Sequence, residues 1–436
     1  MSKVFRVFPN DPIPPSIEKT EGIYLYLKDG TRILDTTAGW NSFAILGGRH
    51  PVVLEAIQKQ LKKFTHIDYK QWTDENVEIL AELLLSKAEH KLNRVYFSGN
   101  SGAEAVEAAM KMSYQVHQDL GRKEKKWFIS REQSYHGATA DALSLSERPN
   151  LEFYQKMLPP YRARIPMHHT LYKMKSGETL DEYARRSAQE LEDKILEIGS
   201  EKVCAFLGET MMGALVGDVP PAPNYWKYIR EVCDKYEVHL ILDEIYCGTG
   251  SSGKIYCCDW DGVTPDFILI SKTLGAGYGV LSAVITSSQF EDVIKLVQGR
   301  LQHSTTHQAH SLSVAAALAV QKILHNDNLL EHINNIGNYF RNMLNQELGD
   351  HEFYRDVRGR GLRFSFEYQC EKKNEFGRKL SEILLQKHLI LINGKWHRIN
   401  FSPAFIINKK QVDQILEYFV REFRLLSENW SSTLGS

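Results

Sequence analysis

The chain has 436 residues, and its 53 Lys and Arg residues almost balance its 54 Asp and Glu residues, giving a formal net charge of −1. With no excess of positive charge, nucleic-acid binding would need a local basic patch, and we expect no such role. Apolar residues make up 43% of the chain and aromatic residues 11%, which excludes disorder as its main state. The length fits two or three domain-sized units, or one large α/β unit with an appendage.

No segment of the chain is typical of export or membrane insertion. The N-terminal residues MSKVFRVFPNDPIPPS contain no continuous apolar run, so we expect no secretory signal. The longest central stretch without charged residues, 273–290, is interrupted by three Gly residues and predicts a loop and a strand. Six Cys residues are too few for a disulfide scaffold and form no CxxC pair. We therefore expect a cytoplasmic protein without membrane contact.

The first elements are two short strands within residues 22–37, around a turn at Asp29 and Gly30. Pro51 is suited to the first position of a helix, which we expect over 51–64. A second helix, over 77–88, follows Thr73 as its candidate N-cap.

The middle of the chain alternates between apolar strands and helices. Strands are predicted at 94–98, 126–130, 203–208, 238–244, 265–271 and 281–287, with helices at 102–117, 225–236 and 290–298. Continuous apolar strands separated by helices are typical of an α/β fold with a mostly parallel sheet covered on both faces. Such sheets bind ligands at the carboxyl ends of their strands.

The last part of the chain predicts a smaller α+β unit. Helices are expected at 313–324 and just beyond, then at 379–387 and 409–423, with strands at 360–368 and 397–403. Neither this part nor the N-terminal strands alone would make a good core. We therefore expect a large domain of residues 52–320 and a small domain formed by residues 1–51 and 321–436.

Small residues follow the strand 94–98 and lead into a helix that begins near Ala103. A helix N-terminus presents unpaired N–H groups and a positive dipole end, which suits an anion, and the hydroxyl of Ser101 adds a possible hydrogen bond. An ordinary capped helix start would have the same sequence.

Two charged residues end later strands. Asp243 follows a buried strand, where a carboxylate can hold a proton on a ring nitrogen, although a cap or a salt bridge is the commoner role for a lone strand-end Asp. Lys272 follows the next strand, between apolar residues and a Gly-rich turn. Partial desolvation lowers the pKa of such a lysine and suits it to a Schiff base with an aldehyde, whereas a surface lysine is the commoner case.

Two other motifs suggest different chemistry. GTGSSG, residues 248–253, fits the G-x-G-x-x-G fingerprint of a nicotinamide-dependent oxidoreductase, but the following KIYCCDWDGVTP does not read as the required helix. His303, His307 and His310 lie close together in sequence, but no Cys or fixed carboxylate accompanies them as in a zinc site. We expect a loop at the first motif and no metal at the second.

In combination, the motifs resemble one known family. An SGAEA turn, a downstream SYHG, a strand-end Asp and a strand-end Lys occur in one order, as in the fold-type I enzymes of pyridoxal 5′-phosphate (PLP), and in particular the class III aminotransferases. The resemblance extends from about Gly22 to the C-terminal helix and includes LDTTAGWNSFAILGGRHP, GETMMGALVG, LILDEIYCGTGSSG, ISKTLGAGY, RGRGL and HRINFSP.

The resemblance implies roles at the cofactor. Lys272 would form the internal aldimine and move the proton between Cα and C4′, and Asp243 would pair with the pyridine nitrogen and keep the ring an electron sink. Further cofactor contacts implied by the family are Ser101, Gly102 and Ala103 at the phosphate, Tyr135 stacked on the ring, His136 and Gly137 in the adjoining turn, and Glu209 and Ile245 near the ring.

The resemblance also implies substrate and subunit contacts. Thr306 would reach the phosphate of the partner subunit, so the family implies a homodimer with shared active sites. Arg398 would bind the substrate carboxylate, for which its two-pronged guanidinium is suited. Trp40 would line the substrate site, although simple packing would also explain an aromatic residue there.

Three departures from the family pattern bear on substrate choice or loop shape, because they spare Lys272 and Asp243. Tyr246 replaces the usual Gln, Ser251 replaces the usual Arg, and the segment after Thr306 lacks the usual Gly and Pro. The form GETMMGALVGDVPP is most similar to the ω-transaminase branch, which often uses pyruvate as amino acceptor.

These observations predict a PLP-dependent aminotransferase that moves an amino group from an amine or ω-amino acid to a 2-oxo acid, with pyruvate the favoured acceptor, by a ping-pong mechanism. An aminomutase or decarboxylase of the same family is the alternative, because it would use the same Lys272 and Asp243. A non-catalytic interaction protein is disfavoured by the presence of both residues.

Overall fold

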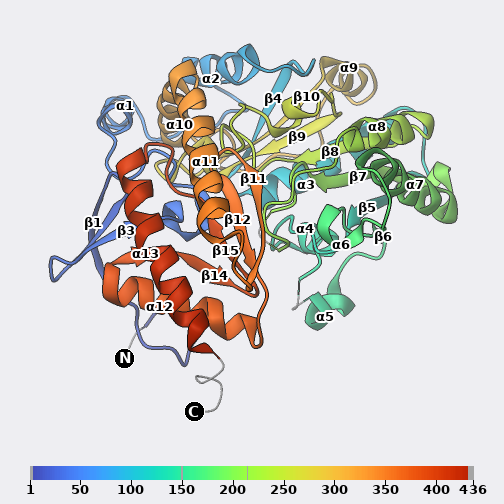
Figure 1. Ribbon diagram of the computed structural model, residues 1–436. Helices are drawn as coiled ribbons and strands as arrows, with labels where there is room; N and C mark the ends of the chain where they lie inside the picture. Colours follow the sequence, from blue (N-terminus) through green and yellow to red (C-terminus); the bar gives the residue numbers. More distant parts are fainter. Residues whose placement is uncertain (1–2, 149–150, 214, 431–436) are drawn as a thin grey trace.

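The structure is a computed structural model that describes residues 3–148, 151–213 and 215–430. Its centre is a seven-stranded sheet with helices on both sides (Figure 1). The strands are β4 (Arg94–Gly99), β5 (Trp127–Arg131), β6 (Arg162–Ile165), β7 (Val203–Glu209), β8 (His239–Asp243), β9 (Phe267–Ile270) and β10 (Ser282–Thr286). Their spatial order is β4-β10-β9-β8-β7-β5-β6.

All neighbours in this sheet run parallel except β10, which is antiparallel to β4 and β9. Strands β7, β8 and β9 are buried along their whole length because helices cover both faces. The expected α/β fold with a mostly parallel sheet is therefore confirmed.

The helices of this part sit on two sides of the sheet. Helix α3 (Gly102–Asp119) packs its Ala-rich face against β4, β7, β8, β9 and β10. Helices α7 (Leu180–Ile198) and α8 (Tyr225–Lys235) pack together, with α8 against β8. The others are α1 (Pro51–Leu61), α2 (Glu75–Ser86), α4 (Ala140–Leu145), α5 (Leu151–Tyr154), α6 (Thr170–Lys173), α9 (Ser288–Val297) and α10 (Ser311–Leu324).

Two smaller sheets lie beside this layer. The first has the order β1 (Ile17–Glu21), β2 (Tyr24–Leu27), β3 (Arg32–Asp35) and β13 (Ile390–Leu391), so it joins strands from both ends of the chain. The second has the order β11 (Tyr354–Arg360), β12 (Arg363–Tyr368), β15 (Arg398–Phe401) and β14 (Asn393–Lys395). The division into residues 52–320 and two joined chain ends stays a prediction.

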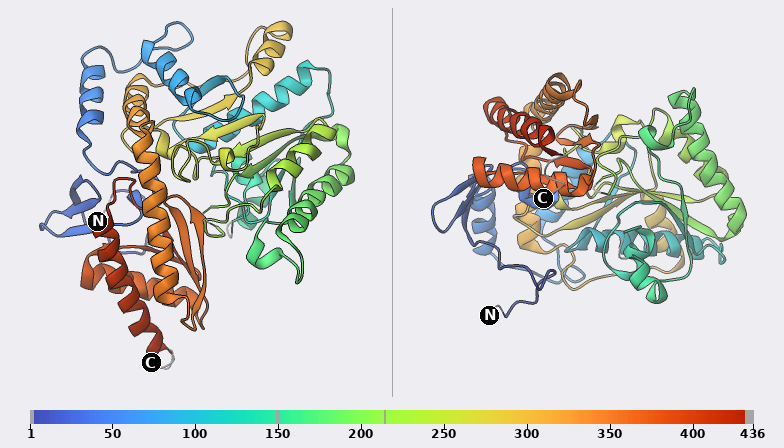
Figure 2. Two further views of the ribbon diagram at one scale, coloured as in Figure 1. Left: turned by 45° about the horizontal axis from the view of Figure 1, so that its top comes forward. Right: turned by 60° about the horizontal axis from the view of Figure 1, so that its bottom comes forward.

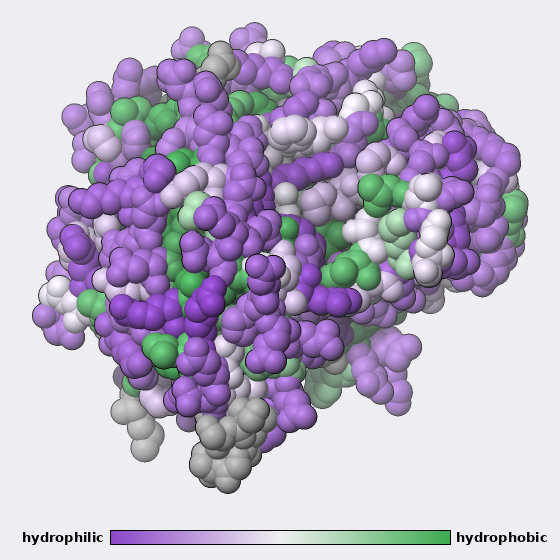
Figure 3. All heavy atoms as spheres, viewed as in Figure 1, coloured by the Kyte–Doolittle hydropathy of each residue, from purple (hydrophilic) through white to green (hydrophobic). Residues whose placement is uncertain are grey.

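Three long helices accompany these sheets: α11 (Asp327–Leu348), α12 (Lys373–His388) and α13 (Lys409–Glu428). Figure 2 shows from two more sides that these orange and red helices gather opposite the green α7 and α8. Hydrophilic residues cover most of the face seen in Figure 3, with apolar residues in smaller patches between them. None of the described helices combines the length and apolar character needed to cross a membrane.

Two local predictions are wrong, and two elements were not predicted. Asp74, not Thr73, caps α2, because its Oδ1 accepts from the N–H of Asn76 at 3.1 Å. The expected strand 360–368 contains a turn at residues 361–362, which separates β11 from β12. Helix α7 and strand β6 are absent from the sequence-based prediction, although Thr179 and Glu182 form a capping box at the start of α7.

Candidate active site

Two carboxyl groups and a lysine lie where three parallel strands end. Glu209 and Asp243 are register partners at the ends of β7 and β8. Lys272 follows β9, the next strand of the sheet, after Ser271. Because parallel strands present their carboxyl ends at one edge, the fold brings these residues together as the sequence predicts.

Asp243 is held as a carboxylate acceptor. Its side chain is buried, with Oδ2 at 2.8 Å from Nδ1 of His136 and Oδ1 accepting from the N–H of Ile245 at 3.0 Å. An ionised carboxylate only accepts, so Nδ1 of His136 carries the proton in this pair. His136 is thus a direct partner of Asp243, which the sequence did not indicate.

Glu209 has different partners from Asp243. Its Oε1 accepts from the N–H of Tyr135 at 3.1 Å, and its Oε2 accepts from the N–H of Gly213 at 2.9 Å. Burial raises the pKa of Glu209; His136 opposes this effect and Asp243 adds to it. Glu209 therefore ties the turn that carries Tyr135 to the end of β7.

The start of α3 packs tightly against both neighbouring turns. Ser101 caps the helix, with its Oγ accepting from the N–H of Glu104 at 3.4 Å. A Cβ atom at Gly102 would lie 2.7 Å from Cδ1 of Ile245, and one at Gly137 would lie 2.7 Å from Cβ of Ala103. The N–H groups at the first two helical positions have no partner within the helix, so this junction can bind an anion.

Lys272 combines a strained backbone with a partly desolvated amine. Its φ of +33° is uncommon for a residue with a side chain. Its Nζ lies 5.0 Å from the centroid of the Tyr246 ring. Burial lowers the pKa of Lys272, Arg363 lowers it further, and Asp243 opposes both. The amine is therefore closer to the neutral form that acts as a nucleophile.

Trp40 and Arg398 lie outside this cluster of contacts. Trp40 is 42% exposed, and Nζ of Lys395 lies 5.4 Å from its ring centroid. Arg398 is only 2% exposed, and its Nη2 donates to the carbonyl oxygen of Leu215 at 2.5 Å. Burial lowers the pKa of Arg398 to about 10. Arg398 borders a cavity of about 520 Å³ that Trp396 also lines.

Thr306 is exposed in the loop before α10. Its carbonyl oxygen lies 3.1 Å from Nε2 of His66. The hydroxyl of the adjacent Thr305 donates to the carbonyl oxygen of Ser98 at 2.8 Å, which places this loop beside the turn that begins α3 in the same chain.

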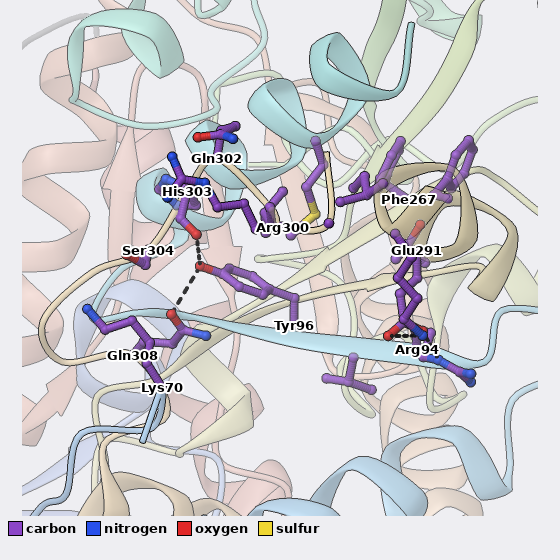
Figure 4. Close-up of a pocket in the computed structure, with 18 residues that line it drawn as sticks. Lys70, Arg94, Tyr96, Phe267, Glu291, Arg300, Gln302, His303, Ser304 and Gln308 are labelled. Carbon is purple, nitrogen blue, oxygen red and sulfur yellow. Dashed lines mark hydrogen bonds and ion pairs between the residues drawn. The ribbon is translucent and has the colours of Figure 1, made fainter. Parts of the chain in front are cut away.

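A larger cavity, of about 970 Å³, does not lie at the strand ends that carry Asp243 and Lys272, and neither residue lines it. Figure 4 shows Tyr96 pointing across it, with its hydroxyl 3.4 Å from the carbonyl oxygen of His303 and 3.3 Å from Oε1 of Gln308. Its wall contains the exposed ion pair of Lys295 and Glu291, at 2.9 Å. Among the described residues, no three His, Cys, Asp or Glu side chains converge as metal ligands would.

Sequence reasoning missed two buried charged residues near Tyr246. Arg363 on β12 is fully buried and donates from Nε to the carbonyl oxygen of Tyr246 at 3.3 Å. Asp218, in the loop after β7, is also fully buried, and its Oδ2 accepts from Ser365 and Asn400 at 2.6 and 3.0 Å. The sequence contained one signal for Arg363, namely a charged residue inside LRFSF, a run that is otherwise mostly apolar.

The motif at residues 248–253 is a loop, as expected, and is followed by a short 3-10 helix at Cys257–Trp260. It therefore lacks the long helix that the dinucleotide fingerprint requires. In contrast, the strand-end cluster offers a carboxylate, a depressed-pKa amine and an anion-binding helix start. These three groups fit PLP, which carries a ring nitrogen, an aldehyde and a phosphate.

Comparisons with known proteins agree with this chemistry. The family model "Aminotransferase class-III" matches residues 8–423. An uncharacterized aminotransferase of Schizosaccharomyces pombe is 36% identical, over 93% of this chain and 91% of the relative. Gamma aminobutyrate transaminase 2 of Solanum lycopersicum is 31% identical, over 93% and 90%. The omega transaminase of Pseudomonas jessenii, solved in complex with PMP, has a TM-score of 0.89 and 30% identity over 95% of this chain and 93% of that one.

Proposed function

The chain belongs to the class III aminotransferase family, and on this premise we propose that it transfers an amino group from an amine or ω-amino acid to a 2-oxo acid, with pyruvate as the favoured acceptor. The protein is a PLP-dependent transaminase of fold type I. The proposal concerns its substrates and the order of the reaction. In a ping-pong order, the donor would leave its amino group on the cofactor and depart as an aldehyde or ketone before the 2-oxo acid binds.

The observation that carries the proposal is the joint placement of Asp243 and Lys272 at adjacent strand ends, beside the start of α3. When bound, PLP supplies an aldehyde that condenses with amines and a ring that accepts the electron pair of a broken Cα–H bond. Asp243 would hold the proton of the ring nitrogen, because His136 and the N–H of Ile245 fix both of its oxygens.

The remaining residues would orient the cofactor and move the proton. The phosphate would bind at the start of α3, to Ser101, Gly102 and Ala103. Gly137 packs so closely against Ala103 that a side chain at position 137 would not fit. Glu209 would fix the turn that carries Tyr135 against the ring. The Nζ atom of Lys272 would take the proton from the substrate Cα and return it at C4′ of the cofactor.

The bond from Nη2 of Arg398 to the carbonyl oxygen of Leu215 uses one of its five N–H groups, and a substrate carboxylate would bind to others. Burial of Arg398 next to Arg358 lowers the pKa of its guanidinium, so an incoming carboxylate would relieve an unfavourable electrostatic environment. Trp40 would form an apolar wall nearby. The name of the Solanum lycopersicum relative, a gamma aminobutyrate transaminase, supports an ω-amino acid as donor.

We also propose a homodimer in which Thr306 of each subunit reaches the phosphate of its partner. Thr306 is exposed but lies in a loop tied to the start of α3 through Thr305. Light scattering of the purified protein tests the dimer. Mixing inactive Lys272→Ala and Thr306→Ala chains should restore part of the activity, because a mixed dimer keeps one intact site. A monomer, or no recovery after subunit exchange, would contradict this arrangement.

The substrate proposal is tested by half-reactions with a panel of amines. Holoenzyme is mixed with one amine and no acceptor, and the absorbance of the cofactor is followed; pyruvate or 2-oxoglutarate is then added. We expect one equivalent of amine to change the spectrum and the 2-oxo acid to restore it. A mutase or decarboxylase would instead turn over continuously without any 2-oxo acid, which would overturn the proposal.

Two variants sharpen the experiment. Lys272→Ala should abolish both turnover and the spectrum of the lysine-bound cofactor, and unchanged turnover would refute its role. Arg398→Met should raise KM for pyruvate and for γ-aminobutyrate while leaving KM for n-butylamine, which has no carboxylate, nearly unchanged. An equal effect on both donors would assign Arg398 to folding rather than to carboxylate binding.

A further inference from the structure

Tyr246 lies between the reactive lysine and a second cation. The Nζ atom of Lys272 and the Cζ atom of Arg363 are each 5.0 Å from the centroid of the Tyr246 ring. Aromatic rings attract cations over their faces at such distances. The two positive groups are therefore no more than about 10 Å apart, with one side chain touching both.

Arg363 forms no ion pair with any described residue; burial lowers the pKa of Arg363, and Tyr246 and the buried Asp218 oppose this effect. It is fully buried, and its hydrogen-bond acceptors among the described residues are the carbonyl oxygens of Tyr246 and Ser42 and the hydroxyl of Ser251. Its Nη1 has no acceptor there. These neutral contacts fix the guanidinium but leave its charge without an ion pair, an arrangement that costs stability.

Tyr246 is fixed at both ends. Its backbone carbonyl accepts from Arg363, and its phenol faces Ser42 and the buried carboxylate of Asp218. A Cβ atom at Gly213 would lie 2.7 Å from Cδ1 of Tyr246, so the ring also packs closely against the loop after β7. Three segments, the loops after β7 and β8 and strand β12, therefore determine where the ring stands.

We propose that Tyr246 and Arg363 are a positioning pair for Lys272: the ring directs the amine, and the unpaired charge of Arg363 favours its uncharged form. The other groups that face Lys272 are Asp243 on β8, Glu209 on β7 and Cys247 after Tyr246. All three favour the charged amine, whereas burial of Lys272 and the charge of Arg363 favour the uncharged form. The inference rests on the proposed function, because it concerns the lysine that binds the cofactor.

The size of the effect follows from Coulomb's law. Two unit charges about 10 Å apart, at the effective dielectric constant of about 20 that suits protein sites, change a pKa by about one unit. Removal of the Arg363 charge stabilises the protonated nitrogen at Lys272, so the pKa rises. Arg363→Met should therefore raise the pH midpoint of the absorbance titration of lysine-bound cofactor in the holoenzyme by about one unit.

Two variants separate charge from structure. Arg363→Lys keeps the charge and should stay within about half a unit of the wild-type midpoint. Tyr246→Leu removes the ring and should lower kcat while the cofactor stays bound, whereas Tyr246→Phe keeps the ring and most of kcat. Arg360→Met is the matched control: Arg360 is the register partner of Arg363 in the same hairpin but pairs with Asp261.

Several outcomes would overturn the proposal. One is an unchanged midpoint in Arg363→Met, and another is an equal shift in Arg360→Met. If Arg363→Met does not fold, Arg363→Lys tests the charge effect: a shift of its pH midpoint by a full unit would contradict that effect. Full kcat in Tyr246→Leu would contradict the role of the ring. A wild-type protein with no cofactor absorbance at all would refute the proposed function itself, which separates the two failures.

Discussion

Glu209 and Asp243 are register partners on neighbouring strands, yet their carboxyl groups have different surroundings. Two backbone N–H groups hold Glu209, whereas Asp243 faces the ring of His136. Burial and the nearby Asp243 both raise the pKa of Glu209. The two carboxyl groups therefore differ in their partners: Glu209 is held by backbone N–H groups, whereas Asp243 is held beside an imidazole ring.

This difference predicts unequal effects of neutral replacements. Asp243→Asn should lower kcat roughly 100-fold or more, because it removes the charge that would hold the proton on the ring nitrogen. Glu209→Gln should cost much less, since Gln keeps one carbonyl oxygen that can accept a backbone N–H bond at this site. Steady-state kinetics on both variants, each loaded with cofactor, is the measurement. Asp243→Asn as active as Glu209→Gln would contradict the assignment.

The packing of Gly102 against Ile245 predicts a defect in cofactor retention. Gly102→Ala would place a methyl group 2.7 Å from Cδ1 of Ile245 and so push the start of α3 away from the phosphate site. We expect faster loss of cofactor during dialysis, measured by absorbance. Ile245→Ala should restore retention in the double variant, and Ile245→Ala alone is the control. Failure of this rescue would show that the contact does not shape the site.

Two stacked histidines predict acid sensitivity. His117 and His239 have ring centroids 3.9 Å apart, and Nδ1 of His239 lies 2.7 Å from Oγ of Ser113. Burial lowers the pKa of His239 to about 3 and that of His117 to about 2. The unfolded chain therefore binds protons below about pH 6.5 that the folded chain does not, and stability falls as the pH drops through this window.

His239→Gln removes one of the groups that bind a proton in the unfolded chain but not in the folded chain. Between pH 7 and pH 5, its free energy of unfolding should fall less steeply than that of the wild type, by up to about 1.4 kcal/mol per pH unit. Urea unfolding at several pH values measures both slopes. Parallel slopes for the two proteins would mean that His239 takes up its proton in the folded state.

An aromatic cluster predicts where the C-terminal part of the fold is most sensitive. The ring of Phe401 lies 4.9 Å from Phe340, 5.3 Å from Phe364 and 5.4 Å from Phe419, measured between centroids. Phe401→Ala should lower the free energy of unfolding by about 3–5 kcal/mol. The exposed Leu296 provides a control, because Leu296→Ala should change stability by no more than about 0.5 kcal/mol. Equal losses would argue against a packed cluster.

Asp243 and Lys272 could be placed from sequence because apolar runs show where β8 and β9 end, and parallel strands end at one edge. The contact of His136 with Asp243 could not be predicted from sequence, because it depends on how the loop after β5 folds back over the sheet. Arg363 lies about 90 residues after Lys272 in the chain, and only the packing of β12 against the loop after β8 makes them neighbours. Tyr246 and Ser251, two of the three departures from the family pattern, both contact this arginine.

The small sheet that joins both chain ends can be completed only late in synthesis. The hydroxyl of Thr36 donates to the carbonyl oxygen of Leu391, 355 positions later, and β3 pairs with β13. At translation rates of about 5–20 residues per second, β3 waits roughly 20 to 70 seconds for this partner. During that interval the growing chain exposes an unpaired strand edge, so the nascent protein is most prone to aggregate before its last fifty residues emerge.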